Sequence, residues 1–98
     1  MNQYLVTIDL PAVQTDELVA LIPQQRRRVD ELMAEGTILA YSLAADRSRL
    51  WVTVRAESRG KVAELIASFP LVRFMVVVIQ DLAFHRQPHP MSMPLSLN

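Results

Sequence analysis

The sequence contains no cysteine and only two glycines among its 98 residues. Without cysteine there can be no disulfide framework, no thiolate nucleophile and no cysteine-based metal site. Two glycines cannot build a glycine-rich phosphate loop, and the chain also lacks the His-Glu-x-x-His metal signature. We therefore predict that the protein uses neither a metal nor a cofactor.

The chain also has no net charge, because ten basic residues balance ten acidic ones. No overall field draws such a protein to DNA, RNA or an anionic membrane, so we predict no nucleic-acid partner. No stretch approaches the roughly 18 apolar residues of a membrane span, and the N-terminal MNQYLVTIDL does not resemble a signal peptide. We expect a cytoplasmic protein with no membrane partner.

The chain is richer in apolar residues than a typical soluble domain. Hydrophobic residues make up 51% of the chain and charged residues 20%, against about 45–50% and about 25% in typical soluble domains. A chain of 98 residues forms one domain with one modest core. The excess therefore predicts apolar surface that becomes buried outside the core of the single chain.

Four β-rich runs are bounded by proline, glycine or polar residues, at 3–9, 37–44, 50–56 and 74–82. With two helices between them the order is β-α-β-β-α-β, a ferredoxin-like α+β fold with a four-stranded antiparallel sheet and two helices on one face. Trp51 should then face away from the helices, and the strand at 74–82 is apolar on both of its faces, with Met75, Val77 and Ile79 on one and Phe74, Val76 and Val78 on the other. We predict a homodimer in which a second subunit covers this bare sheet face.

Thr15 and Ser58 are suitable N-cap residues for the two helices. Proline lacks an N–H and disfavours helical geometry in the residue before it, so we predict a short first turn at about 15–22 and a main helix from Pro23 to Glu35. Gly36 should cap that helix. The second helix should end before Pro70.

We expect residues 1–86 to form the domain and residues 87–98 (QPHPMSMPLSLN) a C-terminal tail. Apolar residues alternate with serine and proline along this tail. It is either a disordered terminus or an extended arm that lies against a neighbouring subunit.

Three consecutive arginines, 26–28, occupy the first predicted main helix. On a helical wheel Arg27 lies opposite the apolar stripe and should be solvated, with acidic residues four positions on from it and from Arg26. Gln25 and Arg26 fall inside or at the edge of the stripe that faces the sheet. They either extend along the helix to water or line a pocket between helix and sheet.

Few other side chains are candidates for catalysis or ligand binding. His85 follows the last strand and titrates near neutrality, so it is a candidate general acid or base, or simply a surface histidine. His85 and His89 are four apart, but Pro88 makes a helix there implausible, and we predict no metal site. Tyr4 and Tyr41 could offer hydroxyls to a ligand or serve as packing aromatics.

Two carboxylates, Asp9 and Asp81, lie at strand ends, which often border pockets in layered folds. They are further candidates for polar groups at a ligand site.

Three segments, DELMAEGTI (30–38), ELIASFPLVRFM (64–75) and DLAFHR (81–86), resemble the muconolactone isomerase family. The matching positions are Glu31, Leu32, Gly36, Ser68, Pro70, Leu71, Phe74, Met75, Leu82, Ala83 and His85. The resemblance covers about 25–86, and Pro-Leu-x-x-Phe-Met is its most specific part. It implies a dimeric α+β barrel, in which ferredoxin-like subunits pair through their sheets and assemble into larger homo-oligomers.

The resemblance also implies a cofactor-independent isomerase that moves the double bond of a lactone, which needs a general base for a carbon-bound proton. The catabolic isomerases carry a histidine and an arginine on strand one, and Gln3–Asp9 here holds neither. Arg26, Arg55 or Arg73 could bind a carboxylate on the lactone. We therefore expect a small organic ligand, with His85 as catalytic residue and Tyr4, Gln25 and Arg26 as binding residues. The alternative is a non-catalytic binding or assembly module.

Overall fold

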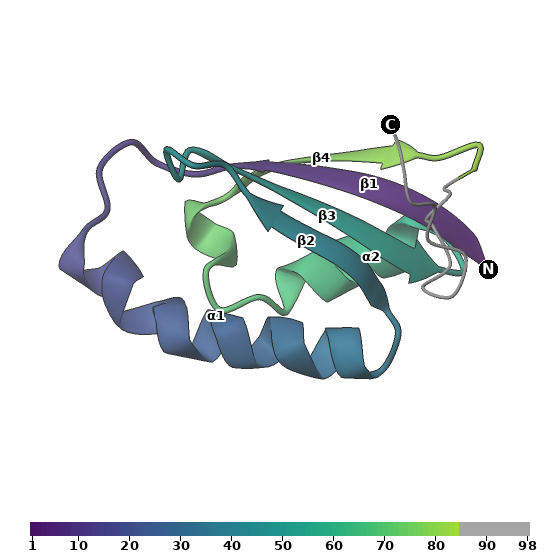
Figure 1. Ribbon diagram of the computed structural model, residues 1–98, viewed down its shortest axis with the longest axis horizontal. Helices are drawn as coiled ribbons and strands as arrows, with labels where there is room; N and C mark the ends of the chain where they lie inside the picture. The colour runs from purple at the N-terminus through teal and green to yellow at the C-terminus, as the bar shows by residue number, and fades with distance from the viewer. Residues whose placement is uncertain (85–98) are drawn as a thin grey trace, which may run out of the picture.

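The computed structural model describes residues 1–84, and the predicted catalytic His85 and the tail at 87–98 lie outside these residues. The elements are strand β1 (Asn2–Asp9), helix α1 (Asp16–Ala34), strands β2 (Ile38–Leu43) and β3 (Arg49–Ala56), helix α2 (Arg59–Ala67), the 3-10 turn η1 (Val72–Phe74) and strand β4 (Val76–Asp81). Both helices lie on one face of a four-stranded sheet (Figure 1). The predicted ferredoxin-like α+β fold is confirmed.

The sheet has the strand order β2-β3-β1-β4, and each neighbouring pair is antiparallel. Strand β1 is central, because Val6 pairs with Val52 on β3 and with Ile79 on β4. The predicted hairpin of β2 and β3 is present, with a register shift between Ile38 and Ala40.

The core lies between the sheet and the helices. Every second residue of β1 and β3 faces the helices, since alternate side chains of a strand point to the same side. The buried cluster is formed by Tyr4, Val6, Ile8, Val29, Leu32, Ile38, Leu50, Val52, Val54, Val62, Ile66 and Phe69.

Helix α1 is continuous through Pro23, so the predicted break at this proline is wrong. Pro23 cannot donate to the carbonyl of Val19, but both residues are exposed, and the missing bond falls on the solvent side of the helix. The helix begins at the predicted cap, where the Thr15 hydroxyl accepts a hydrogen bond of 3.2 Å from the backbone N–H of Leu18. Capping and burial of the opposite face keep the two halves in one helix.

Helix α1 ends at Ala34, and Gly36, the predicted cap, follows two residues later. Gly36 has a φ of 79°, a left-handed conformation that residues with a Cβ rarely adopt. Its N–H donates to the carbonyl of Met33 at 3.0 Å, and the N–H of Thr37 donates to that of Leu32 at 2.9 Å. This pair of bonds is the Schellman motif, which closes the helix and turns the chain into β2.

Strand β4 is shorter than the predicted run at 74–82. The N–H of Phe74 donates to the carbonyl of Leu71 at 2.9 Å, so Phe74 belongs to the turn η1 and the strand begins at Val76.

Within residues 1–84, neither helix covers the other sheet face, which we call the bare sheet face (Figure 1). Trp51, Val76 and Val78 lie on it, with exposed fractions of 38%, 66% and 54%. Thr7 on β1 pairs with Trp51 on β3 and with Val78 on β4. These three side chains therefore form a row across the bare sheet face. Neither described helix has the length and apolar content needed to span a bilayer.

Candidate functional site

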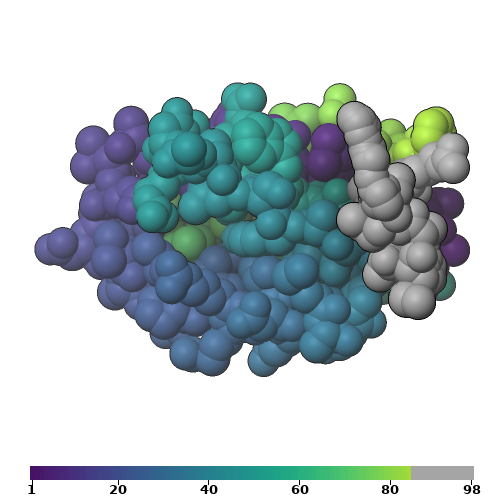
Figure 2. Space-filling view, in the orientation of Figure 1, coloured from purple at the N-terminus to yellow at the C-terminus, as the bar shows by residue number. Residues whose placement is uncertain are grey.

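A cavity of about 130 Å³ opens between α1 and the β2–β3 hairpin. Figure 2 shows the hollow between the blue helix and the teal hairpin, with green atoms of the segment after α2 at its floor. Its lining residues are Leu10, Gln14, Leu18, Ile22, Gln25, Arg26, Tyr41, Leu43, Arg47, Leu50 and Leu71. An apolar pocket with a few polar side chains is the usual form of a small-molecule site.

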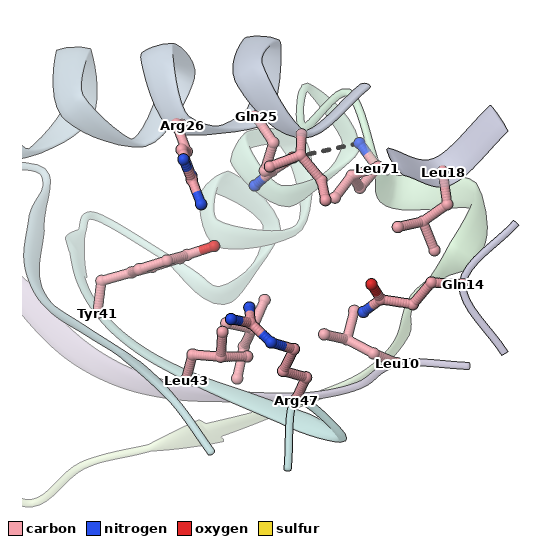
Figure 3. Close-up of a pocket in the computed structure, with 11 residues that line it drawn as sticks. Leu10, Gln14, Leu18, Gln25, Arg26, Tyr41, Leu43, Arg47 and Leu71 are labelled. Carbon is pink, nitrogen blue, oxygen red and sulfur yellow. Dashed lines mark hydrogen bonds between the residues drawn. The ribbon is translucent and has the colours of Figure 1, made fainter. Parts of the chain in front are cut away.

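Gln25 is the buried polar residue of this cavity, with an exposed fraction of 4%. Its Oε1 accepts a hydrogen bond of 3.2 Å from the backbone N–H of Leu71. This bond fixes the orientation of the amide and turns Nε2 into the cavity (Figure 3). Nε2 has no hydrogen-bond partner among the described residues. A buried donor without a partner is rare and costly in folded proteins.

Tyr41 lies on β2 with its hydroxyl directed toward Gln25 and Arg26 (Figure 3). Burial raises the pKa of the Tyr41 phenol above its ordinary value of 10.0, and the Gln25 amide lowers it in part, because it lies close enough to favour the phenolate although the two groups do not meet in a hydrogen bond. At neutral pH the phenol is therefore protonated and can donate a hydrogen bond to an acceptor in the cavity.

Two arginines reach the cavity from different elements. Arg26 comes from α1, and Arg47 comes from the turn between β2 and β3 (Figure 3). No carboxylate or histidine lines the cavity within residues 1–84. The described lining therefore combines apolar side chains with two cations, Arg26 and Arg47, and three neutral side chains that can donate, Gln14, Gln25 and Tyr41.

The neighbouring arginines have other surroundings. Arg27 is exposed, as predicted. The guanidinium of Arg28 contacts Glu31 at 3.4 Å and donates from Nε to the hydroxyl of Ser68 at 3.2 Å. It therefore lies over the edge of the core and links the two helices.

The structure separates the predicted binding residues. Gln25 and Arg26 lie together at the cavity, whereas Tyr4 is buried in the core and is not part of the cavity lining. Tyr4 pairs with Val54 and Asp81, toward the opposite end of the sheet from Leu50. His85 lies outside the described residues, so its role stays a prediction.

The remaining charged candidates form ion pairs elsewhere. Asp9 binds Arg49 at 2.7 Å, and Asp81 binds Arg59 at 3.1 Å. Arg73 is paired with Glu17. These carboxylates therefore hold surface arginines rather than a ligand.

Arg55, the third cation considered, lies near Gly36 at the end of α1 and is not part of the cavity lining. Within residues 1–84, no three potential metal-ligating side chains come together.

The sequence analysis did not indicate two polar residues of the cavity, Gln14 and Arg47. Arg47 sits in a turn, which has no periodicity to indicate where a side chain points. Tyr41 was considered either as a hydroxyl for a ligand or as a packing aromatic, and its position opposite Gln25 depends on how α1 lies along the sheet.

The whole domain matches one family model. The model, described as muconolactone delta-isomerase, matches residues 3–88. The chain belongs to the muconolactone delta-isomerase family. A comparison with curated proteins gave no match.

Among solved structures, the chain is similar to 5-chloro-2-hydroxyhydroquinone dehydrochlorinase from Burkholderia phenoliruptrix AC1100, in complex with 2,5-dihydroxybenzoquinone. The TM-score is 0.56 at 15% sequence identity, over 91% of this chain and 96% of that chain. At this identity the likeness to the dehydrochlorinase establishes a common fold.

Proposed function

We propose that this protein binds a small, oxygen-bearing ring molecule of the lactone type in the cavity and isomerises it. The observation that carries the proposal is the Nε2 donor of Gln25, buried and aimed into the cavity without a partner among the described residues. A ligand oxygen would satisfy this donor. The family match supports a lactone as the ligand.

The size of the cavity supports a ligand of one ring. Its volume is about 130 Å³, and an engineered apolar cavity of about 150 Å³ in another protein holds a benzene molecule. Leucine and isoleucine side chains on both sides would contact the ring. Gln25, Arg26 and Tyr41 bring their polar groups together on one side, whereas Gln14 and Arg47 reach the cavity from elsewhere (Figure 3).

The donors suit the chemistry of a double-bond shift. A base removes a proton from a ring carbon, negative charge develops on the lactone carbonyl oxygen, and the proton returns to another carbon of the conjugated system. Gln25 Nε2 and the Tyr41 hydroxyl are donors that could stabilise this oxygen. His85 remains our candidate for the base.

We also propose that the protein is a homodimer, and a unit of a larger homo-oligomer, that pairs through the bare sheet face. The exposed row of Trp51 and Val78 supports a second copy as the occupant, since so large an apolar face is costly in water. The family resemblance gives the same arrangement.

The rival function is a non-catalytic binding or assembly module. To separate the two, the protein is incubated with muconolactone, a butenolide that carries a carboxymethyl group, and the ultraviolet absorbance is followed while calorimetry measures binding. We expect turnover that falls by at least about tenfold in Tyr41→Phe, because one donor to a developing oxyanion is lost. It should also fall in a double Arg26→Ala, His85→Ala variant.

Gln24→Met is the matched control, because Gln24 is exposed on the same helix and is not part of the cavity lining. It should behave as the wild type. Binding without turnover would favour the non-catalytic module, and neither binding nor turnover of any butenolide would contradict a lactone site.

A further inference from the structure

The turn between β2 and β3 holds Arg47 in a disfavoured backbone conformation. Its φ of 64° makes it the one non-glycine residue with positive φ within residues 1–84. Among residues with a Cβ, asparagine and aspartate adopt this region most readily, and arginine has no side chain suited to it. Such outliers persist where the surrounding structure enforces them, and they often lie at functional sites.

Several hydrogen bonds enforce this turn. The N–H of Arg47 donates to the carbonyl of Ala44 at 2.8 Å, and Oδ1 of Asp46 accepts from the N–H and hydroxyl of Ser48 at 3.0 and 2.6 Å. The carbonyl of Ser48 accepts from the N–H of Leu10 at 2.9 Å, which ties the turn to the end of β1. The Asp46 carboxylate is hydrogen-bonded to Ser48 and stabilises the turn. It forms no ion pair with the guanidinium of Arg47.

This backbone conformation directs the Arg47 side chain toward the cavity. The guanidinium reaches the cavity from the hairpin, across from Arg26 on α1 (Figure 3). No described lining residue carries a negative charge. Within residues 1–84, the ion pairs of the protein involve neither Arg26 nor Arg47. Two guanidinium groups around an apolar cavity favour a ligand with an anionic oxygen.

We propose that Arg47 is a specificity-determining residue, which selects acidic ring molecules by binding an anionic oxygen of the ligand together with Arg26. This inference rests on the proposed function, because it assigns a charge to the ligand of the same cavity. The anionic oxygen belongs either to a carboxylate or to an ionised enol, and both are planar acceptors that a guanidinium can bind through two N–H groups.

The test compares an acid with its neutral ester. Calorimetry measures the dissociation constants of muconolactone, its methyl ester and 2,5-dihydroxybenzoquinone, whose ring hydroxyls are enols conjugated to carbonyls. We expect the wild type to bind the acid more tightly than the ester. Weaker binding of the quinone than of muconolactone assigns a carboxylate, and the reverse assigns an enol.

Two amide variants separate charge from backbone conformation. Arg47→Gln and Arg47→Asn both remove the guanidinium, but asparagine tolerates a positive φ and glutamine does not. Both should weaken binding of the acid by about five- to tenfold, the range expected for one partly exposed charged hydrogen bond, and leave the ester unchanged. The melting temperature should be higher in Arg47→Asn than in Arg47→Gln. Arg47→Lys should retain most of the acid binding.

Equal weakening of acid and ester in Arg47→Gln, or no weakening of either, would overturn the specificity role and leave the proposed function standing. If the wild type binds none of the three compounds, the proposed function fails, and the specificity role with it. Arg27→Gln removes a solvent-facing charge from α1 and serves as the control, with unchanged affinity for every compound.

Discussion

The side-chain oxygen of Gln25 accepts a hydrogen bond from the backbone N–H of Leu71, over a distance of 3.2 Å. The two residues lie 46 positions apart in the sequence. The bond joins the middle of α1 to the segment that leads from α2 into β4. It also determines which end of the amide faces the cavity, so the same side chain joins these two segments and presents its N–H groups to the cavity.

Replacing Gln25 by methionine should therefore destabilise the protein. Gln25→Met keeps the size of the side chain but leaves the buried N–H of Leu71 without an acceptor, which costs about 1–2 kcal/mol of unfolding free energy. Urea unfolding followed by circular dichroism measures this change. Gln24→Met, at the exposed neighbouring position, should alter the free energy by less than about 0.5 kcal/mol. A Gln25→Met variant as stable as the wild type would show that the bond is not structural.

The phenol of Tyr41 should titrate above the ordinary tyrosine value of 10.0. Burial favours the neutral form, so above about pH 10 the unfolded chain loses its proton first and the folded protein loses stability. Below the unfolded pKa, this contribution is fully retained. Absorbance at about 295 nm, compared between the wild type and Tyr41→Phe, isolates the transition. Gln25→Met should raise this pKa further, and a Tyr41 that titrates at or below the ordinary value would contradict burial against α1.

The bare sheet face should control assembly. Val78→Glu places a charge among the exposed apolar side chains and should convert the proposed dimer to monomers at micromolar concentration. Light scattering after size-exclusion chromatography measures the mass. Val13→Glu adds the same charge at an exposed position before α1 and should leave the mass unchanged. A wild-type protein that is monomeric at micromolar concentration would contradict pairing through this face.

Much of the fold could be predicted because local signals agree with it. Thr15 and Gly36 indicated the ends of α1, and apolar alternation indicated which side of β3 is buried. The break at Pro23 was predicted wrongly, because local propensity cannot account for the cap and core contacts that keep α1 continuous. Tertiary packing overrides propensity in such cases.

The candidate site could be predicted in part. Gln25 and Arg26 were indicated by their angle on the helical wheel, since a polar residue inside an apolar stripe must find a partner. Of the two strand tyrosines, Tyr4 was predicted as a binding residue, although nothing in the sequence separates it from Tyr41. The strand register separates them, because Tyr41 pairs with Val52 and lines the cavity, whereas Tyr4 lies in the core. Arg47 depends on a turn conformation that no sequence periodicity indicates.

The most direct test of a ligand site at this cavity is the side-chain amide resonance of Gln25 in a nitrogen–proton correlation spectrum, assigned by its loss in Gln25→Met. On titration with muconolactone, this resonance should shift to saturation as Nε2 gains an acceptor, while that of Gln24 stays in place. Muconolactone that binds without moving the Gln25 resonance, and instead shifts resonances on the bare sheet face, would contradict the account.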